Sequence, residues 1–172
     1  NKDSILMYRL GDFYEMFFDD AKTASDFLGL TLTGRDCGLE ERAPMCGVPY
    51  HSCEAYIGRL IEKGYKVAIC EQTEDPAEAK GLVRRDVIRI ITPGTVIEDS
   101  MLDASRNNFL ACILRTTDAF GVGFVDSSTG EFDVTAFKGT DNFSAVLSEL
   151  SRFSPTEVIV PEGMLTVVEE EK

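Results

Sequence analysis

The residues best suited to metal chemistry are five cysteines and a single histidine. Cys46, His51 and Cys53 lie close together in the sequence, and thiolate and imidazole groups are common ligands of zinc. Their spacing matches no common Cys-x-x-Cys pattern, and an odd number of irregularly spaced cysteines predicts no disulfide framework. The sequence therefore favours free thiols in a reducing cytosol over a zinc site.

Carboxylates that could hold catalytic metal ions gather in the second half of the chain. Asp126 ends an apolar segment, and Glu131 and Asp133 follow shortly after it. Nucleases with an RNase H-like fold hold two metal ions with several carboxylates, one of them on the first strand. Here the first predicted strand, residues 109–114, has no acidic residue, and the alternation after Gly130 predicts that Glu131 and Asp133 face outward. We therefore expect no nuclease activity and no catalytic site in this chain.

The net charge of −13 argues against broad electrostatic binding to DNA. Proteins that bind DNA phosphates use lysine and arginine, because neutralising phosphates releases counterions. Any DNA binding must therefore rest on a local patch or on other parts of a larger protein. A basic run of Lys80, Arg84, Arg85 and Arg89 could face DNA, but pairing with the acidic residues among 74–78 is the favoured interpretation. The sequence contains no Gly-x4-Gly-Lys-Ser/Thr phosphate loop and no apolar run of about 20 residues that could span a membrane.

The first hundred residues alternate between strand-like and helix-like patterns. Residues 5–14 resemble a single strand, and the apolar spacing from about Glu15 to Leu28 predicts a helix whose first turn contains Glu15. A second helix is predicted over residues 52–63. Further strands are predicted at residues 30–35, 67–72 and 87–92, an irregular loop at residues 36–50, and a very short helix that starts at Asp75.

Residues 98–107 are polar and aperiodic, which is typical of a boundary, so we predict domains at residues 1–100 and 107–172. The second domain begins with strand patterns at residues 109–114, 119–126 and 131–137, then a helix around residues 143–150, then a continuously apolar segment at residues 157–160 typical of a buried parallel strand. This order is the opening of an RNase H-like fold, and we expect the domain to be truncated. The predicted class is α/β (α+β), a mixed sheet with flanking helices followed by this domain.

An ordered set of motifs resembles the mismatch-binding domain of the MutS family. The family carries a Phe-x-Glu motif, which here is Phe13-Tyr14-Glu15. The resemblance covers essentially all of residues 5–99 and, more loosely, the segment from residue 107 onward; the cysteines between Cys37 and Cys53 depart from it. Further matches in the family's order are Asp19-Asp20-Ala21, Pro44-Met45-Cys46-Gly47-Val48-Pro49-Tyr50-His51, Ala68-Ile69-Cys70-Glu71-Gln72 and Arg89-Ile90-Ile91-Thr92-Pro93-Gly94-Thr95.

The resemblance implies that Phe13 wedges beside a mispaired base from the minor groove. An aromatic ring can replace a lost stacking partner, and an inserted apolar wedge unstacks a step and kinks the duplex. A mismatched step costs less to deform than a paired one, so discrimination needs no particular base sequence. From its apolar neighbours alone, Phe13 would instead be a core residue.

Three further residues are implied as DNA contacts by the resemblance. Glu15 forms a hydrogen bond with the edge of a displaced base, as a carboxylate with a base donor or in its protonated form with a base acceptor. It is repelled by the phosphates of paired DNA, so it sharpens selectivity more than affinity. Arg35 and His51 contact the DNA backbone near the mismatch. Without the resemblance, Glu15 would be an acid in a helix's first turn, Arg35 a solvated loop residue and His51 a residue at a helix start.

The resemblance also implies partners and cofactors outside this chain. ATP and Mg²⁺ belong to an ATPase domain of the full-length protein, and the chain itself is expected to hold no cofactor and no metal. The expected partners are mismatched double-stranded DNA, a MutL-type protein that meets the connector region, and a second copy in a homodimer. We expect a cytoplasmic, nucleoid-associated protein with no membrane contact. An interaction module that does not read DNA is the alternative.

Overall fold

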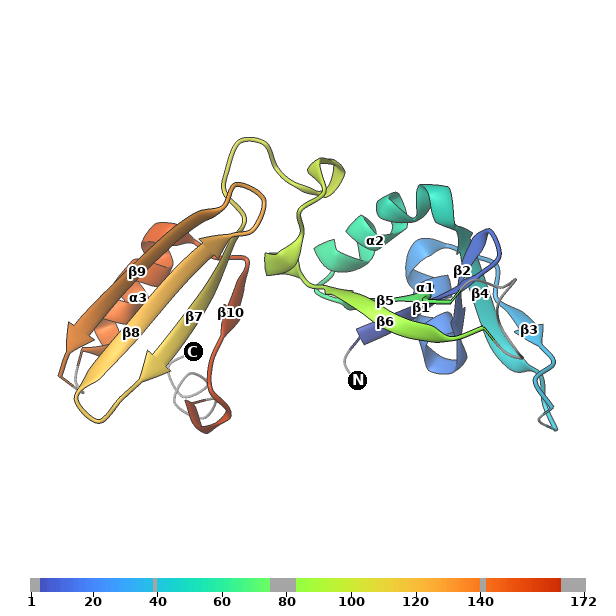
Figure 1. Ribbon diagram of the computed structural model, residues 1–172, viewed down its shortest axis with the longest axis horizontal. Coiled ribbons are helices and arrows are strands. Elements are labelled where there is room, and N and C mark those ends of the chain that lie inside the picture. The colour runs from blue at the N-terminus through green and yellow to red at the C-terminus, as the bar shows by residue number, and fades with distance from the viewer. Residues whose placement is uncertain (1–3, 39, 75–82, 140–141, 165–172) are drawn as a thin grey trace. The chain divides into compact units, whose positions relative to one another are not determined.

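The computed structural model describes residues 4–38, 40–74, 83–139 and 142–164 (Figure 1). The chain divides into two compact units, Asn1–Thr92 and Pro93–Lys172. Each unit combines one mixed sheet with helices, so the predicted α/β class is confirmed. None of the helices in the described ranges is long and apolar enough to cross a membrane.

The first unit is built on a six-stranded sheet with the order β3-β4-β2-β1-β5-β6. Only the β1–β5 pair is parallel among these neighbours. The parallel pair needs a crossover, and the chain between β1 and β5 supplies it with two helices. The strands are β1 (Ser4–Leu10), β2 (Phe13–Phe17), β3 (Thr33–Arg35), β4 (Ala43–Pro49), β5 (Lys66–Gln72) and β6 (Arg85–Ile91).

The first predicted strand is in fact a hairpin, so the prediction of one strand over residues 5–14 was wrong. β1 and β2 pair antiparallel on either side of a turn at Gly11 and Asp12. Gly11 has a φ of 56°, a left-handed conformation that glycine adopts without steric strain. The turn makes Phe13 the first residue of β2 and places Glu15 in the strand. The expectation that Glu15 begins a helix was therefore wrong as well.

Two helices pack against the sheet of the first unit. Helix α1 (Phe18–Leu28) contacts β1, β2 and β4, and helix α2 (Cys53–Glu62) contacts β4, β5 and α1. The core beneath them consists of apolar side chains that are almost fully buried: Ile5, Met7, Met16, Ala21, Ala24, Val48, Leu60 and Val67. Helix α2 follows the prediction closely, because Ile57, Leu60 and Ile61 of its apolar stripe are buried.

Strand β4 corrects the prediction of an irregular loop over residues 36–50. Pro44, Gly47 and Pro49 lower the strand propensity of this segment. It is nevertheless a strand, because it pairs with β2 on one side and with β3 on the other. The short helix predicted from Asp75 lies outside the described residues.

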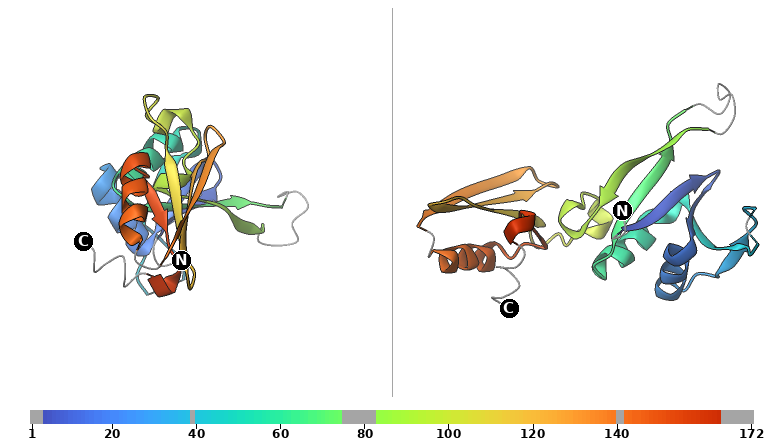
Figure 2. Two further views of the ribbon diagram at one scale, coloured as in Figure 1. Left: turned by 90° about the vertical axis from the view of Figure 1, so that its left-hand side faces the viewer. Right: turned by 90° about the horizontal axis from the view of Figure 1, so that it is seen from below.

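The second unit contains a four-stranded sheet with the order β10-β7-β8-β9. Its strands are β7 (Phe109–Arg115), β8 (Ala119–Asp126), β9 (Glu131–Lys138) and β10 (Glu157–Ile159), and its helix is α3 (Phe143–Phe153). β10 runs parallel to β7, and the other pairs are antiparallel, which is the predicted order. Helix α3 lies along one face of the sheet (Figure 2, right).

The facing of β9 contradicts the alternation rule used above. Phe120, Val122 and Phe124 of β8 are buried in the core, and their partners across the ladder are Phe137, Thr135 and Asp133. Residues opposite one another share a face, so Asp133 and Glu131 lie on the same face as the core. Phe132 and Val134 point the other way and are 68% and 67% exposed. The predicted buried strand at the end is likewise half-exposed, since Val158 is 40% and Ile159 50% exposed.

The segment after Thr92 packs as part of the second unit. The Pro93 carbonyl accepts a hydrogen bond from the Asn108 side chain at 2.9 Å. The Gly94 N–H donates to the Glu157 carboxylate at 3.0 Å, and a Cβ at residue 94 would lie 2.9 Å from the Cβ of Glu157. These contacts hold the residues that follow Thr92 against the second unit.

Candidate nucleic-acid interface

Phe13 occupies an exposed position at the start of β2. It follows the Gly11–Asp12 turn directly, and 47% of its surface is accessible. Tyr14 and Met16, the alternate residues of the strand, are buried beneath the helices. Successive side chains of a strand point to opposite faces, so Phe13 and Glu15 share the face that the helices leave open. An exposed aromatic ring on a strand paired on both sides is positioned rigidly, and Phe13 is no core residue.

Side-chain and backbone contacts restrain the turn of the hairpin that consists of β1, Gly11, Asp12 and β2, here called the Phe13 hairpin. The Arg9 Nε donates to the Gly11 carbonyl at 2.5 Å. The Tyr50 N–H donates to the Asp12 carbonyl at 2.9 Å. The Arg9 guanidinium also stacks on the ring of Tyr50, 3.6 Å from its centroid. These contacts restrict the turn that sets the direction of Phe13.

Tyr14 anchors the same hairpin from below. Its hydroxyl donates a hydrogen bond to the Glu71 carboxylate on β5, which also lies 3.9 Å from Arg9. Burial, followed by the Glu71 carboxylate, raises the pKa of the Tyr14 hydroxyl well above its usual range. The Tyr14 hydroxyl therefore stays a neutral hydrogen-bond donor at every physiological pH. In the Phe-Tyr-Glu triplet, the first and third side chains point outward and the second holds the strand in the core.

Glu15 and Arg35 form a direct ion pair. The Arg35 Nη1 lies 2.5 Å from the Glu15 Oε2. Arg35 belongs to β3 and Glu15 to β2, with β4 between them. The residue opposite Glu15 on β4 is Gly47, and a Cβ there would lie 3.5 Å from the Glu15 Cγ. The missing side chain at residue 47 leaves room for the carboxylate to lie across β4 toward Arg35.

His51 lies exposed beside the Phe13 hairpin. It belongs to the 3-10 turn Tyr50–Ser52, directly before α2, and its ring meets the Tyr50 ring edge-on at 5.9 Å. Pro49, two residues earlier, pairs with Phe13 in the sheet. The structure thus brings His51 to the end of β4 beside Phe13, whereas Arg35 pairs with Ala43 at the opposite end. Glu15 and Arg35 are the two predicted site residues that touch.

The charge of the chain is unevenly divided between the units. Residues 1–92 carry 16 acidic and 12 basic side chains, whereas residues 93–172 carry 14 acidic and 5 basic ones. The unit that contains Phe13 therefore repels a polyanion less strongly than the other unit does. In the basic run, Arg84 pairs with Asp86 at 3.0 Å, and Arg85 donates to the Arg9 and Val83 carbonyls. Both contacts are within the protein, as expected, although the acid that pairs with Arg84 is Asp86.

The alternative of a zinc site loses its support. Cys46 is buried under α1, and its thiol donates to the Ala21 carbonyl at 3.4 Å. Desolvation raises the pKa of this thiol to about 11, and zinc requires the thiolate. His51 is exposed to solvent. Among the described residues, no group of three or more histidine, cysteine, aspartate or glutamate side chains is arranged to hold a metal ion.

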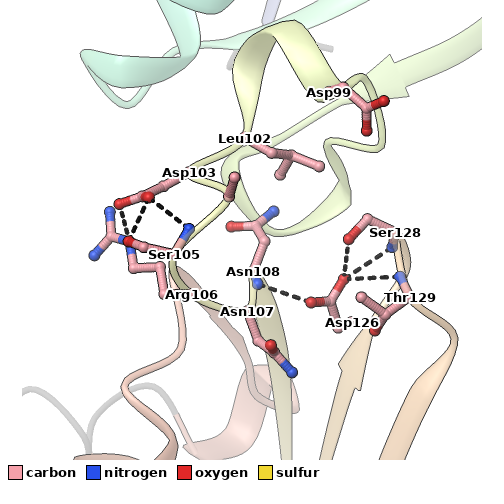
Figure 3. A pocket seen from close by; sticks show the side chains of 11 residues that line it. Asp99, Leu102, Asp103, Ser105, Arg106, Asn107, Asn108, Asp126, Ser128 and Thr129 are labelled. Carbon is pink, nitrogen blue, oxygen red and sulfur yellow. Dashed lines mark hydrogen bonds and ion pairs between the residues drawn. The ribbon is translucent and has the colours of Figure 1, made fainter.

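Asp126 has a structural role at the end of β8 (Figure 3). Its carboxylate accepts hydrogen bonds from the Asn108, Ser128 and Thr129 N–H groups at 2.9, 2.9 and 3.3 Å and from the Ser128 hydroxyl at 2.6 Å. Burial alone would raise the pKa of Asp126, but these donors outweigh it and hold the pKa below its ordinary value. A metal ion would have to displace them, so Glu131 and Asp133 add no support for a nuclease despite sharing the face of Asp126.

We expect the second unit to lose stability in acid because of Asp126. A carboxyl whose pKa is depressed in the folded state stabilises the fold above its unfolded pKa of about 4, and this contribution is lost as the pH falls through the folded value. In the Asp126→Asn variant at pH 7, the backbone amides of residues 107–131 should therefore exchange faster than in wild type, because the second unit is less stable. The difference should shrink below about pH 4. Hydrogen exchange with both proteins at the same pH measures it; an equal difference at pH 7 and pH 3 would contradict this role.

Two residues of the interface were missed by sequence reasoning. Arg9 and Tyr50 hold the turn before Phe13, yet they are 41 positions apart. Tyr50 belongs to the Gly-Val-Pro-Tyr-His segment, whose sequence indicates the location of the site but not this contact. Gly47 opens the same segment, and a Cβ there would lie 3.5 Å from the Glu15 Cγ.

Comparison with known proteins matches both parts of the chain to one family. The family model for MutS domain I matches residues 1–100, and the model for MutS domain II matches residues 108–171. The DNA mismatch repair protein MutS of Acetivibrio thermocellus is 60% identical over 92% of this chain, and that of Clostridium novyi is 57% identical over 95% of it. MutS of Ruminiclostridium cellulolyticum is 55% identical over 92% of the chain. The chain spans about 18% of the length of each of these relatives.

Proposed function

The chain belongs to the MutS family of DNA mismatch repair proteins, and from this premise we propose that its first domain recognises mismatched or unpaired bases in duplex DNA. Phe13 is the wedge, which enters from the minor groove and stacks beside the mispaired base. Glu15 meets the displaced base, and Arg35 and His51 contact the DNA backbone. The recognition domain covers residues 1–100 and the connector domain residues 107–172.

The exposure of Phe13 on a rigid strand is the observation that carries this proposal. The ring has 47% of its surface accessible and stands on a strand that is paired on both sides, so it is available to a ligand and held by the sheet. Arg9 and Tyr50 restrain the turn beside it, so little conformational entropy is lost when the ring inserts. A restrained, protruding ring fits a base step that opens easily.

Deformability supplies the selectivity. Insertion unstacks a base step and bends the duplex, and the mismatched step resists this least. Stacking on an aromatic ring contributes about 1–3 kcal/mol per base and tolerates any base. One site can therefore accept many different mismatches, which reading of base edges in the major groove does not allow.

Other activities of the whole protein are placed outside this chain. We propose that the chain is part of a longer cytoplasmic protein that binds ATP and Mg²⁺ through a separate domain, works as a homodimer and meets a MutL-type partner through the connector domain. The first unit has a net charge of −4, from 16 acidic and 12 basic side chains, so most phosphate contacts must come from elsewhere in the assembly. ATP binding is proposed for that separate domain and for no residue of this chain.

A binding experiment across salt concentrations tests the function. Fluorescence anisotropy of the full-length protein should show tighter binding to a duplex with one G·T mismatch than to its paired control. Both affinities should fall as salt rises, because phosphate contacts release counterions, while the ratio between them persists, because stacking does not depend on salt. Equal affinity for the two duplexes at every salt concentration would overturn the proposal.

An interaction module is the second candidate, and the second unit favours it. Its sheet exposes Leu114, Phe132 and Val134 on the face away from α3, beside an excess of 14 acidic over 5 basic side chains. Several exposed apolar side chains on one face of a sheet are typical of a contact with protein. The salt experiment separates the candidates, since a chain that is only an interaction module gives the full-length protein no preference for the mismatched duplex at any salt concentration.

A further inference from the structure

We propose that Arg35 is a positioning residue for Glu15, and that the pair couples contact with a DNA phosphate to the reading of the base. The inference rests on the proposed function and goes beyond it, because a simple backbone contact at Arg35 would strengthen binding to all DNA equally. In the coupled arrangement, Arg35 contributes to discrimination between mismatched and paired DNA, and it does so only through Glu15.

The geometry that carries the inference is the ion pair across β4. The Arg35 Nη1 lies 2.5 Å from the Glu15 Oε2, and the Glu15 side chain is 18% exposed while that of Arg35 is 47% exposed. The carboxylate is thus held down on the sheet, and the guanidinium that holds it faces solvent. A DNA backbone approaching this face meets Arg35 before it meets the carboxylate.

The position of Gly47 restricts how Glu15 can lie. A Cβ at residue 47 would lie 3.2 Å from the Tyr14 carbonyl and 3.5 Å from the Glu15 Cγ. The contact with the Tyr14 carbonyl would be tight and the contact with the Glu15 Cγ an ordinary one, so glycine is the residue that crowds Glu15 least. Glu15 lies two residues from Phe13 on the same face and reaches across β4 to Arg35.

Arginine can exchange one anion for another. Its planar guanidinium fits a carboxylate and a phosphate equally well. When a phosphate takes Arg35, the Glu15 carboxylate loses its partner at the moment that it faces the DNA. Beside a paired step the free carboxylate has only phosphates near it, which repel it. Beside a displaced base it gains an N–H donor, so the lost ion pair is replaced.

A double-mutant cycle tests the coupling. The measured quantity is the ratio of affinities for the G·T and the paired duplex, in full-length wild type, Arg35→Ala, Glu15→Ala and the double variant. We expect each single variant to lower the ratio about fivefold and the double variant to lower it no further, because residues that act together are not additive. Arg35→Lys keeps the charge and should restore part of the ratio.

Arg84→Ala is the matched control, since it also removes an exposed arginine paired with a carboxylate in the first unit. It should leave the ratio unchanged. If Arg35→Ala lowers both affinities by one factor, or if the effects of Arg35→Ala and Glu15→Ala multiply, the coupling is wrong and Arg35 is a plain phosphate contact.

Phe13→Ala, measured on the same duplexes, separates this failure from failure of the proposed function. A ratio lost with Phe13→Ala but additive for Arg35 and Glu15 refutes only the coupling. A ratio that survives Phe13→Ala refutes the wedge itself.

Discussion

Phe124→Ala should strongly destabilise the second unit and leave the stability of the first unit unchanged. Phe124 is 1% exposed and stacks on Phe153 with ring centroids 4.0 Å apart, while Phe109 meets both rings edge-on. Replacing a buried phenylalanine with alanine typically costs about 3–5 kcal/mol, from lost burial and from the cavity that remains. A domain of this size has a total stability of about 5–15 kcal/mol, so the loss is a large fraction of it.

Hydrogen exchange localises this effect. Peptides from β7, β8 and α3 should exchange much faster in the variant, whereas peptides from β1, β5 and α2 should match wild type, because the aromatic core around Phe124 lies entirely within the second unit.

Phe132→Ala is the control for Phe124→Ala, as it removes the same side chain from the neighbouring strand at a position that is 68% exposed. It should change stability by less than about 0.5 kcal/mol. Faster exchange in both units with Phe124→Ala would show that they fold as one. A large loss of stability with Phe132→Ala would show that the open face of the sheet is covered.

Phe132 also shows why local alternation was a poor guide to facing. The sequence of residues 131–137 does not show which face of the strand is buried, because each face carries an apolar residue. Phe137 shares a face with Glu131 and Asp133, and Ala136 shares the other face with Phe132. The pairing with β8 decides between them, because Phe120, Val122 and Phe124 must face α3. That information lies in tertiary packing and is absent from the strand's own sequence.

The elements that were predicted well have strong local signals. The stripe Ile57, Leu60 and Ile61 predicts α2, and the continuous apolar run in Lys66–Gln72 predicts β5. The hairpin was missed because Gly11 was interpreted as punctuation within one strand, although a glycine followed by Asp12 is also a turn signal. Strand β4 was not predicted because Pro44 and Pro49 lower the strand propensity of the segment. Its pairing with β2 and β3 stabilises it as a strand.

The site was predictable in its residues but not in its contacts. Phe13 and Glu15 were identified from a motif, and their shared face follows from the spacing of two residues in a strand. The pairing of Glu15 with Arg35 depends on the order β3-β4-β2, which places residues 20 positions apart on one surface. No local pattern encodes this order, and the glycine that makes room for the contact lies on a third strand.

Phe13→Ala is the substitution with the largest expected effect on binding. The alanine variant keeps the hairpin, because the contacts of Arg9, Tyr14 and Tyr50 do not involve the Phe13 side chain. It removes the ring that replaces the lost stacking partner, which is worth about 1–3 kcal/mol or roughly 5- to 150-fold in affinity. Affinity for paired DNA should change little, since the ring does not enter a paired step.

The matched control is Phe18→Ala. Phe18 lies in the same unit and is 52% exposed. Its φ is 55°, and because alanine also has a Cβ, the substitution leaves the backbone restriction at residue 18 unchanged. The two variants therefore remove the same side chain at different positions. Phe18→Ala should bind both duplexes as wild type does.

The most direct measurement is therefore the affinity of full-length wild type, Phe13→Ala and Phe18→Ala for a G·T duplex and its paired control, by anisotropy at low salt. We predict that wild type and Phe18→Ala prefer the mismatch and that Phe13→Ala binds the two duplexes alike. If Phe13→Ala retains the preference of wild type, the ring at residue 13 is not the wedge and the proposed recognition is wrong.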